Sequence, residues 1–185
     1  MKMTLIIAVL ALGLAGQDSS SLRKPLPVKT SLCSIVAAPS KYDQALVVIR
    51  GELIMGREVF MLQDEGCTDR LRTGDHVWPP AIWLTPPNDN VRLPAGYELD
   101  RGTIDQFNEA VRQAHAEPRK WKVLVTLAGK IDSRQRYFGS REPNGQWVGN
   151  GFGNLNYCSA QLVYMSVSDW VITPREEEGG ASKKP

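Results

Sequence analysis

The sequence has little of what metal centres, membrane spans and nucleic-acid surfaces need. Two histidines and three cysteines occur in 185 residues, without a CxxC pair, and short ligand spacing is the usual mark of a zinc site. The apolar run Leu5 to Leu14 has ten residues, whereas a membrane-spanning helix needs roughly 20. A formal net charge of +2 is far from the strongly basic surface typical of nucleic-acid-binding proteins.

The beginning of the chain has the pattern of a secretory signal peptide. Lys2 precedes the apolar run, and Gly13-Leu14-Ala15-Gly16 provides a small-residue cleavage site. We therefore predict a signal peptide at 1–15 and export to the periplasm or the medium. The mature chain would contain no transmembrane segment, and an exported protein has no ATP for its chemistry.

The remaining sequence predicts one domain with two simple flanking segments. Residues 16–30 are polar and contain Pro25 and Pro27, which predicts a flexible lead-in. Residues 174–185 form a charged tail with too little apolar content to fold. Residues 31–173 have the length of a single domain, and they show neither an internal repeat nor a second domain.

Alternating apolar residues predict five strands, and a 3.6-residue period predicts one principal helix. Thr103 and Gln106 fit a capping box at the start of that helix, which Pro118 ends. Ser31 caps a shorter helix that Pro39 stops. The predicted short helix is 32–38, the strands are 45–54, 57–63, 81–85, 121–131 and 160–171, and the principal helix follows residue 103.

Three cysteines in an exported chain suggest one disulfide and one unpaired thiol. Cys33–Cys67 is the first choice, because Cys158 lies in a separate glycine-rich region. Spacing alone does not determine the pairing. The alternative is a zinc site that combines the cysteines with His76 or His115, which no ligand motif supports.

The order of these elements is that of an OB-fold, a five-stranded Greek-key barrel with a helix between strands three and four. The predicted fold class is therefore mainly β with one principal helix, and the short N-terminal helix is an addition to the barrel. Gly51, inside the first strand, predicts a bulge or sharp bend of the kind that small barrels need. An open α+β sandwich is the alternative.

Several motifs resemble those of a group of uncharacterised exported bacterial proteins with OB-like barrels. They are Leu32-Cys33, Pro39-x-x-Tyr42-Asp43, Val48-x-Arg50-Gly51, Glu58-x-Phe60-x-Leu62-x-Asp64-x-Gly66-Cys67, Ile82-Trp83-Leu84, Gly151-Phe152-Gly153-Asn154, Ala160-Gln161-Leu162 and Ser166-Val167-Ser168-Asp169. The resemblance implies the fold and export, and it implies no activity. Asn154 stands where that group usually has histidine, so any function of the histidine would be missing here.

Binding is the function that the sequence favours. OB barrels bind ligands on strands two and three and the adjacent loops, where aromatic rings and arginines suit a protein or glycan of the cell envelope. Export argues against nucleic acid. The glycine-rich segment 149–154 lacks the GxxxxGK[ST] phosphate motif, and we expect no cofactor. The candidate ligand-binding residues are Phe60, Trp78, Arg136, Tyr137, Trp147 and Phe152.

A metal-dependent hydrolase of the nuclease type is the alternative function. The carboxylates of Glu52, Glu58 and Asp64 could hold a calcium ion. Arg50 and Arg57 could neutralise phosphoryl oxygens. Mixed charges on paired strands also form ordinary cross-strand salt bridges. Neither the spaced aspartates of that nuclease family nor a GxSxG nucleophile motif occurs, and no catalytic residue is predicted. The sequence does not determine the oligomeric state.

Overall fold

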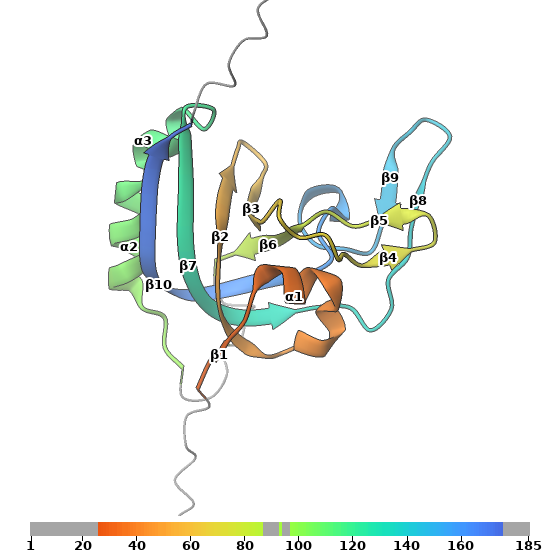
Figure 1. Cartoon of the computed structure of the whole chain (residues 1–185), viewed down its shortest axis with the longest axis horizontal. Coiled ribbons are helices and arrows are strands. Elements are labelled where there is room, and N and C mark those ends of the chain that lie inside the picture. The colour runs from red at the N-terminus through yellow and green to blue at the C-terminus, as the bar shows by residue number, and fades with distance from the viewer. Residues whose placement is uncertain (1–25, 87–92, 94–96, 176–185) are drawn as a thin grey trace, which may run out of the picture.

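The computed structural model describes residues 26–86, 93 and 97–175, and within these it is mainly β with three α-helices (Figure 1). The predicted signal peptide, most of the lead-in and residues 176–185 of the tail lie outside the described residues. The helices are α1 (Leu32–Ala37), α2 (Arg101–Ala110) and α3 (Arg112–Ala116). The strands are β1 (Val28–Lys29), β2 (Leu46–Met55), β3 (Phe60–Gln63), β4 (Arg72–Thr73), β5 (His76–Val77), β6 (Ala81–Thr85), β7 (Trp121–Asp132), β8 (Gly139–Arg141), β9 (Trp147–Gly149) and β10 (Gln161–Pro174).

Five of the strands close into a barrel. They pair in the order β2-β3-β6-β10-β7, and β7 pairs back onto β2. The β6–β10 pair is parallel, and the other four pairs are antiparallel. The predicted closed β-barrel is therefore confirmed, and the open sandwich is wrong. Closure leaves these strands with few unpaired edges.

Gly51 lies where β2 changes its partner from β7 to β3. Glu52 pairs with both strands, opposite Leu124 of β7 and Gln63 of β3. A Cβ atom at Gly51 would lie 2.7 Å from Cγ of Leu62, so a larger residue would not fit there. The register of β2 contains no bulge at Gly51. The irregular positions lie instead in the β7–β10 pair, between Tyr164 and Ser166 and between Val167 and Asp169.

The barrel interior is filled by the predicted apolar faces of its strands. Val47, Ile49 and Leu53 of β2 are buried, as are alternate residues along β7. Helix α1 adds its apolar side to this core, and Ser31 accepts a hydrogen bond from the backbone N–H of Ser34, as its capping role requires. Helix α1 lies beside β2 and β6, and α2 lies beside β10 (Figure 1).

The ends of several elements differ from the predictions. The α2 cap is Asp100, whose carboxylate accepts from the N–H of Thr103, so the capping box at Thr103 is wrong. Asp100 is the better cap because its charge also suits the positive end of the helix. Strand β10 continues three residues past the predicted end at Val171, and Val28–Lys29 of the lead-in pairs with β2.

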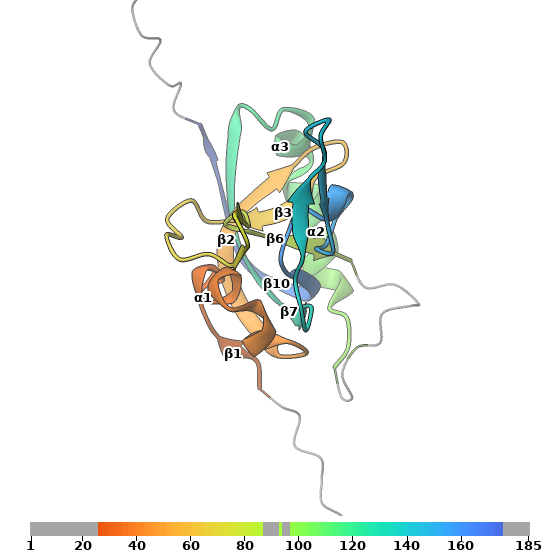
Figure 2. The ribbon, with the colours of Figure 1, turned by 90° about the vertical axis from the view of Figure 1, so that its right-hand side faces the viewer.

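Two short hairpins that the sequence did not predict lie together at the side of the barrel away from α2 (Figures 1 and 2). They are β4–β5 and β8–β9. Both pair only two or three residues per strand, too few to show an alternating pattern. Within the described residues, no helix combines the length and apolar character that crossing a membrane requires.

Candidate binding groove

A groove of about 730 Å³ crosses the outer side of β3 and β6. Met61 of β3 and Trp83 of β6 lie in register opposite each other and supply its apolar side chains. The turn between β2 and β3 adds one wall, and the segment between β7 and β10 adds the other. The lining residues are Glu58, Val59, Met61, Trp83, Asn154 and Tyr157.

Gly153 determines how closely the second wall approaches Trp83. Its φ of +77° lies in the left-handed region that favours glycine. A Cβ atom there would lie 2.1 Å from Cε3 of the Trp83 ring. Only glycine therefore allows the backbone to pack on the indole.

A hydrogen bond joins the two walls. The side-chain N–H of Asn154 donates to the backbone carbonyl of Glu58 over 2.8 Å. Asn154 begins the short 3-10 turn Asn154–Asn156, and Tyr157 follows it with 47% of its surface exposed. Asn154 thus holds the hairpin turn against the loop.

Three of the predicted ligand-binding aromatics form a packed cluster with His76 under the two short hairpins. Trp78 is fully buried, and it meets the rings of Tyr137 and Trp147 edge-on at centroid distances of 5.4 and 5.6 Å. Trp147 stacks on His76 at 3.6 Å. Burial first, and Arg141 second, lower the pKa of His76, which favours the neutral ring. The cluster packs the β4–β5 hairpin against the β8–β9 hairpin.

Phe152 and Arg136 lie near this cluster but in different environments. Phe152 is 8% exposed, and the guanidinium of Arg134 lies 4.2 Å from its ring centroid, a cation–π contact. Arg136 is exposed. Burial leaves the rings of Trp78 and Phe152 without a face for a ligand to stack on.

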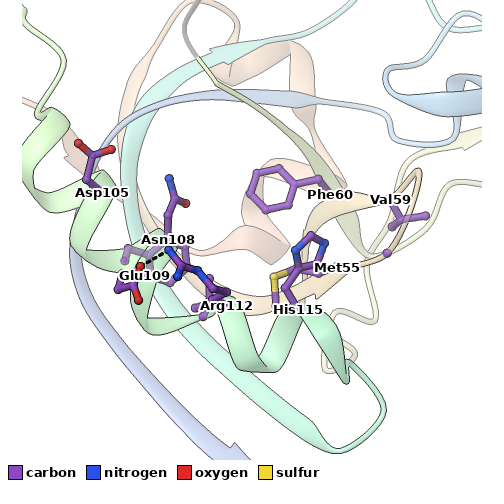
Figure 3. A pocket seen from close by; sticks show the side chains of 11 residues that line it. Met55, Val59, Phe60, Asp105, Asn108, Glu109, Arg112 and His115 are labelled. Atoms are coloured by element: carbon purple, nitrogen blue, oxygen red, sulfur yellow. Dashed lines mark hydrogen bonds and ion pairs between the residues drawn. The ribbon is translucent and has the colours of Figure 1, made fainter.

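Phe60 lies apart from the other candidates, in a cleft between the β2–β3 hairpin and helices α2 and α3 (Figure 3). The cleft has a volume of about 710 Å³. Phe60 meets the ring of Tyr164 at 6.1 Å. The helices supply polar residues to the rim, where Glu109 and Arg112 form an ion pair. The sequence-predicted residues are therefore distributed over two places, and neither is the groove.

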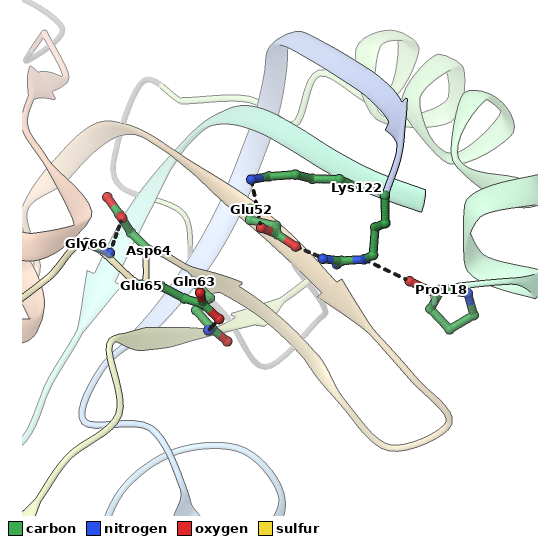
Figure 4. A network of polar contacts seen from close by, with 8 residues as sticks. Glu52, Gln63, Asp64, Glu65, Gly66, Pro118 and Lys122 are labelled. Atoms are coloured by element: carbon green, nitrogen blue, oxygen red, sulfur yellow. Dashed lines mark hydrogen bonds and ion pairs between the residues drawn. The ribbon is translucent and has the colours of Figure 1, made fainter. Parts of the chain in front are cut away.

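The carboxylates of the hydrolase alternative are also separated. Glu52 forms ion pairs with Lys122 and Arg175 in a depression of about 500 Å³ (Figure 4). Glu58 lies at the other end of the hairpin and lines the groove. Arg50 pairs with Asp169 across the sheet. These ion pairs occupy Glu52 and Arg50, one carboxylate and one guanidinium of the set that the alternative assigns to a cation and a phosphate.

Among the described residues, one group of side chains has metal-ligand spacing, namely Cys33, Asp64 and Cys67. Cys33 and Cys67 form a disulfide, which confirms the predicted pairing. A disulfide has no thiolate to give to zinc, so the alternative zinc site based on these cysteines is wrong. The bond joins α1 to the loop that follows β3.

Cys158 is a buried free thiol, and burial raises its pKa from 9.0 to about 12. The folded protein at pH 8 should hold about a thousandfold less thiolate at Cys158 than the unfolded chain, because each pKa unit is a factor of ten. We expect iodoacetamide to leave Cys158 unmodified in the native protein and to alkylate it in urea. Mass spectrometry of the modified peptide measures this, and rapid native alkylation would contradict it.

The groove was not predicted, because none of its lining residues by itself has a pattern that indicates a binding site. Trp83 lies in the apolar segment 81–84, which is typical of core packing, yet it is only half-buried. Val59, just before β3, and Met61, within β3, are apolar residues two positions apart, so both face the same side of the hairpin. The available signal was the glycine–aromatic–glycine segment 151–153, whose glycines allow the chain to pack on aromatic rings.

The chain matches no known family model, no curated protein and no solved structure. The resemblance to exported bacterial proteins therefore stays a prediction from the motifs.

Proposed function

We propose that the chain is an exported OB-type binding module and that the groove over β3 and β6 is its ligand site. Numbered in chain order, the barrel strands follow the closed order 1-2-3-5-4-1, with α2 and α3 between the third and fourth. OB barrels take ligands on strands two and three, between the first and the last interstrand loops. The groove has that position, and this observation carries the proposal.

The lining of the groove favours binding over catalysis. It combines partly exposed apolar and aromatic side chains with two polar residues, Glu58 and Asn154. Asn154 already bonds the opposite wall, and the lining contains no histidine, cysteine, serine or second carboxylate beside Glu58. A surface of this kind suits a protein or glycan of the cell envelope better than a reacting substrate.

Export is supported by the pattern at 1–15 and by the Cys33–Cys67 disulfide, since disulfides persist in oxidising compartments. One experiment tests export and binding together. The full chain is produced in a bacterium with a photoreactive phenylalanine analogue in place of Tyr157. We expect a chain without residues 1–15 outside the cytoplasm, cross-linked on illumination to an envelope protein or glycan.

The same analogue in place of Val171 is the matched control. Val171 lies on β10, outside the groove lining, and its exposure of 43% is close to that of Tyr157. Adducts from position 157 alone would support the groove as the binding site. Equal adducts from both positions, or none from either, would count against it, and an uncleaved cytoplasmic chain would count against export.

A further inference from the structure

If the groove is the ligand site proposed above, the chemistry of its lining restricts the class of ligand that it can bind. A sugar needs directed hydrogen bonds for its hydroxyl groups as well as a ring to stack on. The side chains that carry such groups are Glu58, Tyr157 and Trp83, because the Asn154 amide already donates to the carbonyl of Glu58, and the rest of the lining surface is apolar. An apolar side chain needs no such bonds, and it can pack against Val59, Met61 and the rings of Trp83 and Tyr157.

The charge of the lining restricts the class of ligand further. Glu58 is the only charged residue among the six that line the groove. A carboxylate beside an apolar depression repels phosphates and acidic peptides and attracts lysine or arginine. Arg57 precedes it in the same turn and is exposed, and it does not line the groove.

A second apolar hollow lies on the other side of the β2–β3 hairpin turn from the groove. Val59 lines both the groove and the cleft of Figure 3, so the turn separates two hollows of similar volume. Met55, Phe60 and Phe107 contribute apolar side chains to the cleft. Its charged residues are Asp105, Glu109 and Arg112, of which Glu109 and Arg112 neutralise each other, and His115 adds a titratable group. Asp105 therefore gives the cleft one more carboxylate than guanidinium groups, and Glu58 likewise makes the groove acidic.

We propose that the groove binds a peptide segment with a bulky apolar side chain beside a lysine or arginine. The apolar side chain packs on Trp83 and Met61, and the cation pairs with Glu58. A second apolar residue of the same segment would pass over Val59 into the cleft. Two anchors of this kind give a peptide more buried area than one depression can.

The test uses a phage-displayed library of random ten-residue peptides, selected against the mature protein and against its Glu58→Lys variant. Selection on the wild type should enrich sequences that pair aromatic or large aliphatic residues with lysine or arginine. Selection on Glu58→Lys should shift the charged position to aspartate or glutamate. A synthetic wild-type peptide should bind Glu58→Lys about tenfold more weakly, and added salt should reduce this difference.

Glu142→Lys is the matched control, because it makes the same charge change at an exposed residue in the turn of the β8–β9 hairpin. It should select the same peptides as the wild type. NMR titration then locates the site, and the selected peptide should shift the backbone amide resonances of Trp83 and Tyr157.

The outcomes separate this inference from the proposed function. If chitohexaose shifts these resonances and no peptide does, the groove is a glycan site, so the inference is wrong and the proposed function stands. The pairing of Glu58 with a basic residue would be wrong if the enriched peptides lack lysine and arginine. It would also be wrong if selection on Glu58→Lys enriches the same charged residues as selection on the wild type. If neither peptides nor chitohexaose affect Trp83 and Tyr157, both proposals fail.

Discussion

A chain in which Cys33 and Cys67 are both replaced by alanine should lose about 4 kcal/mol of its free energy of unfolding. The bond joins residues 34 apart in sequence, and closing a loop of that length in the unfolded chain removes conformational entropy worth about this much. The effect is large against the roughly 5–15 kcal/mol that stabilise a domain. Helix α1 should be the first element to detach, although its Leu32 and Ile35 are buried in the barrel core.

Urea unfolding followed by circular dichroism measures this loss. The reduced wild-type protein is the control, because it keeps both sulfur atoms and loses only the bond between them. It should unfold at nearly the same urea concentration as the double variant. A loss below about 1 kcal/mol in both samples would show that packing alone holds α1 on the barrel, contrary to the chain-entropy argument.

The barrel could be predicted because each of its strands shows its pattern within a few residues. Strand β7 alternates from Val123 to Leu127, and β2 has three apolar residues on one face. The order of strands and helix then restricted the topology to few alternatives. The disulfide was predicted from the position of Cys158 in a separate segment, and not from any knowledge of distance.

The groove could not be predicted in the same way, because its residues come from three separate segments. Val59, Trp83 and Tyr157 meet only after β3 has paired with β6 and the loop before β10 has folded back over them. An aromatic residue in the sequence does not by itself indicate whether its ring is buried or exposed to a ligand. Its ring suits a core and its polar atom suits a surface, so a loop tryptophan fits either environment.

Trp78 shows how this ambiguity was resolved. The sequence places it in a polar segment beside two prolines, which favoured an exposed ring for a ligand. The structure encloses it completely, and its indole N–H donates to Oγ1 of Thr73 over 2.9 Å. Short hairpins of two or three paired residues need such a ring, since their backbone bonds alone are marginally stable.

Trp78→Ala should therefore destabilise the protein by about 4 kcal/mol, the usual cost of removing a buried tryptophan. The cavity would lie between His76, Tyr137 and Trp147, which now meet the indole at 5.2–5.6 Å. The close contact with Gly151, where a Cβ atom would lie 2.6 Å from Cζ3 of the ring, would also be lost. Thermal unfolding monitored by circular dichroism measures the change.

Tyr157→Ala is the matched control, because it removes an aromatic ring that is 47% exposed in the groove. Its stability should stay within about 0.5 kcal/mol of the wild type, as is usual for surface positions, while its affinity for a selected peptide falls. The two variants thus separate a ring that holds the hairpins together from a ring that contacts a ligand. If Trp78→Ala kept its stability and lost peptide binding, the ring would have to become accessible to a ligand, and the cluster would belong to the binding surface.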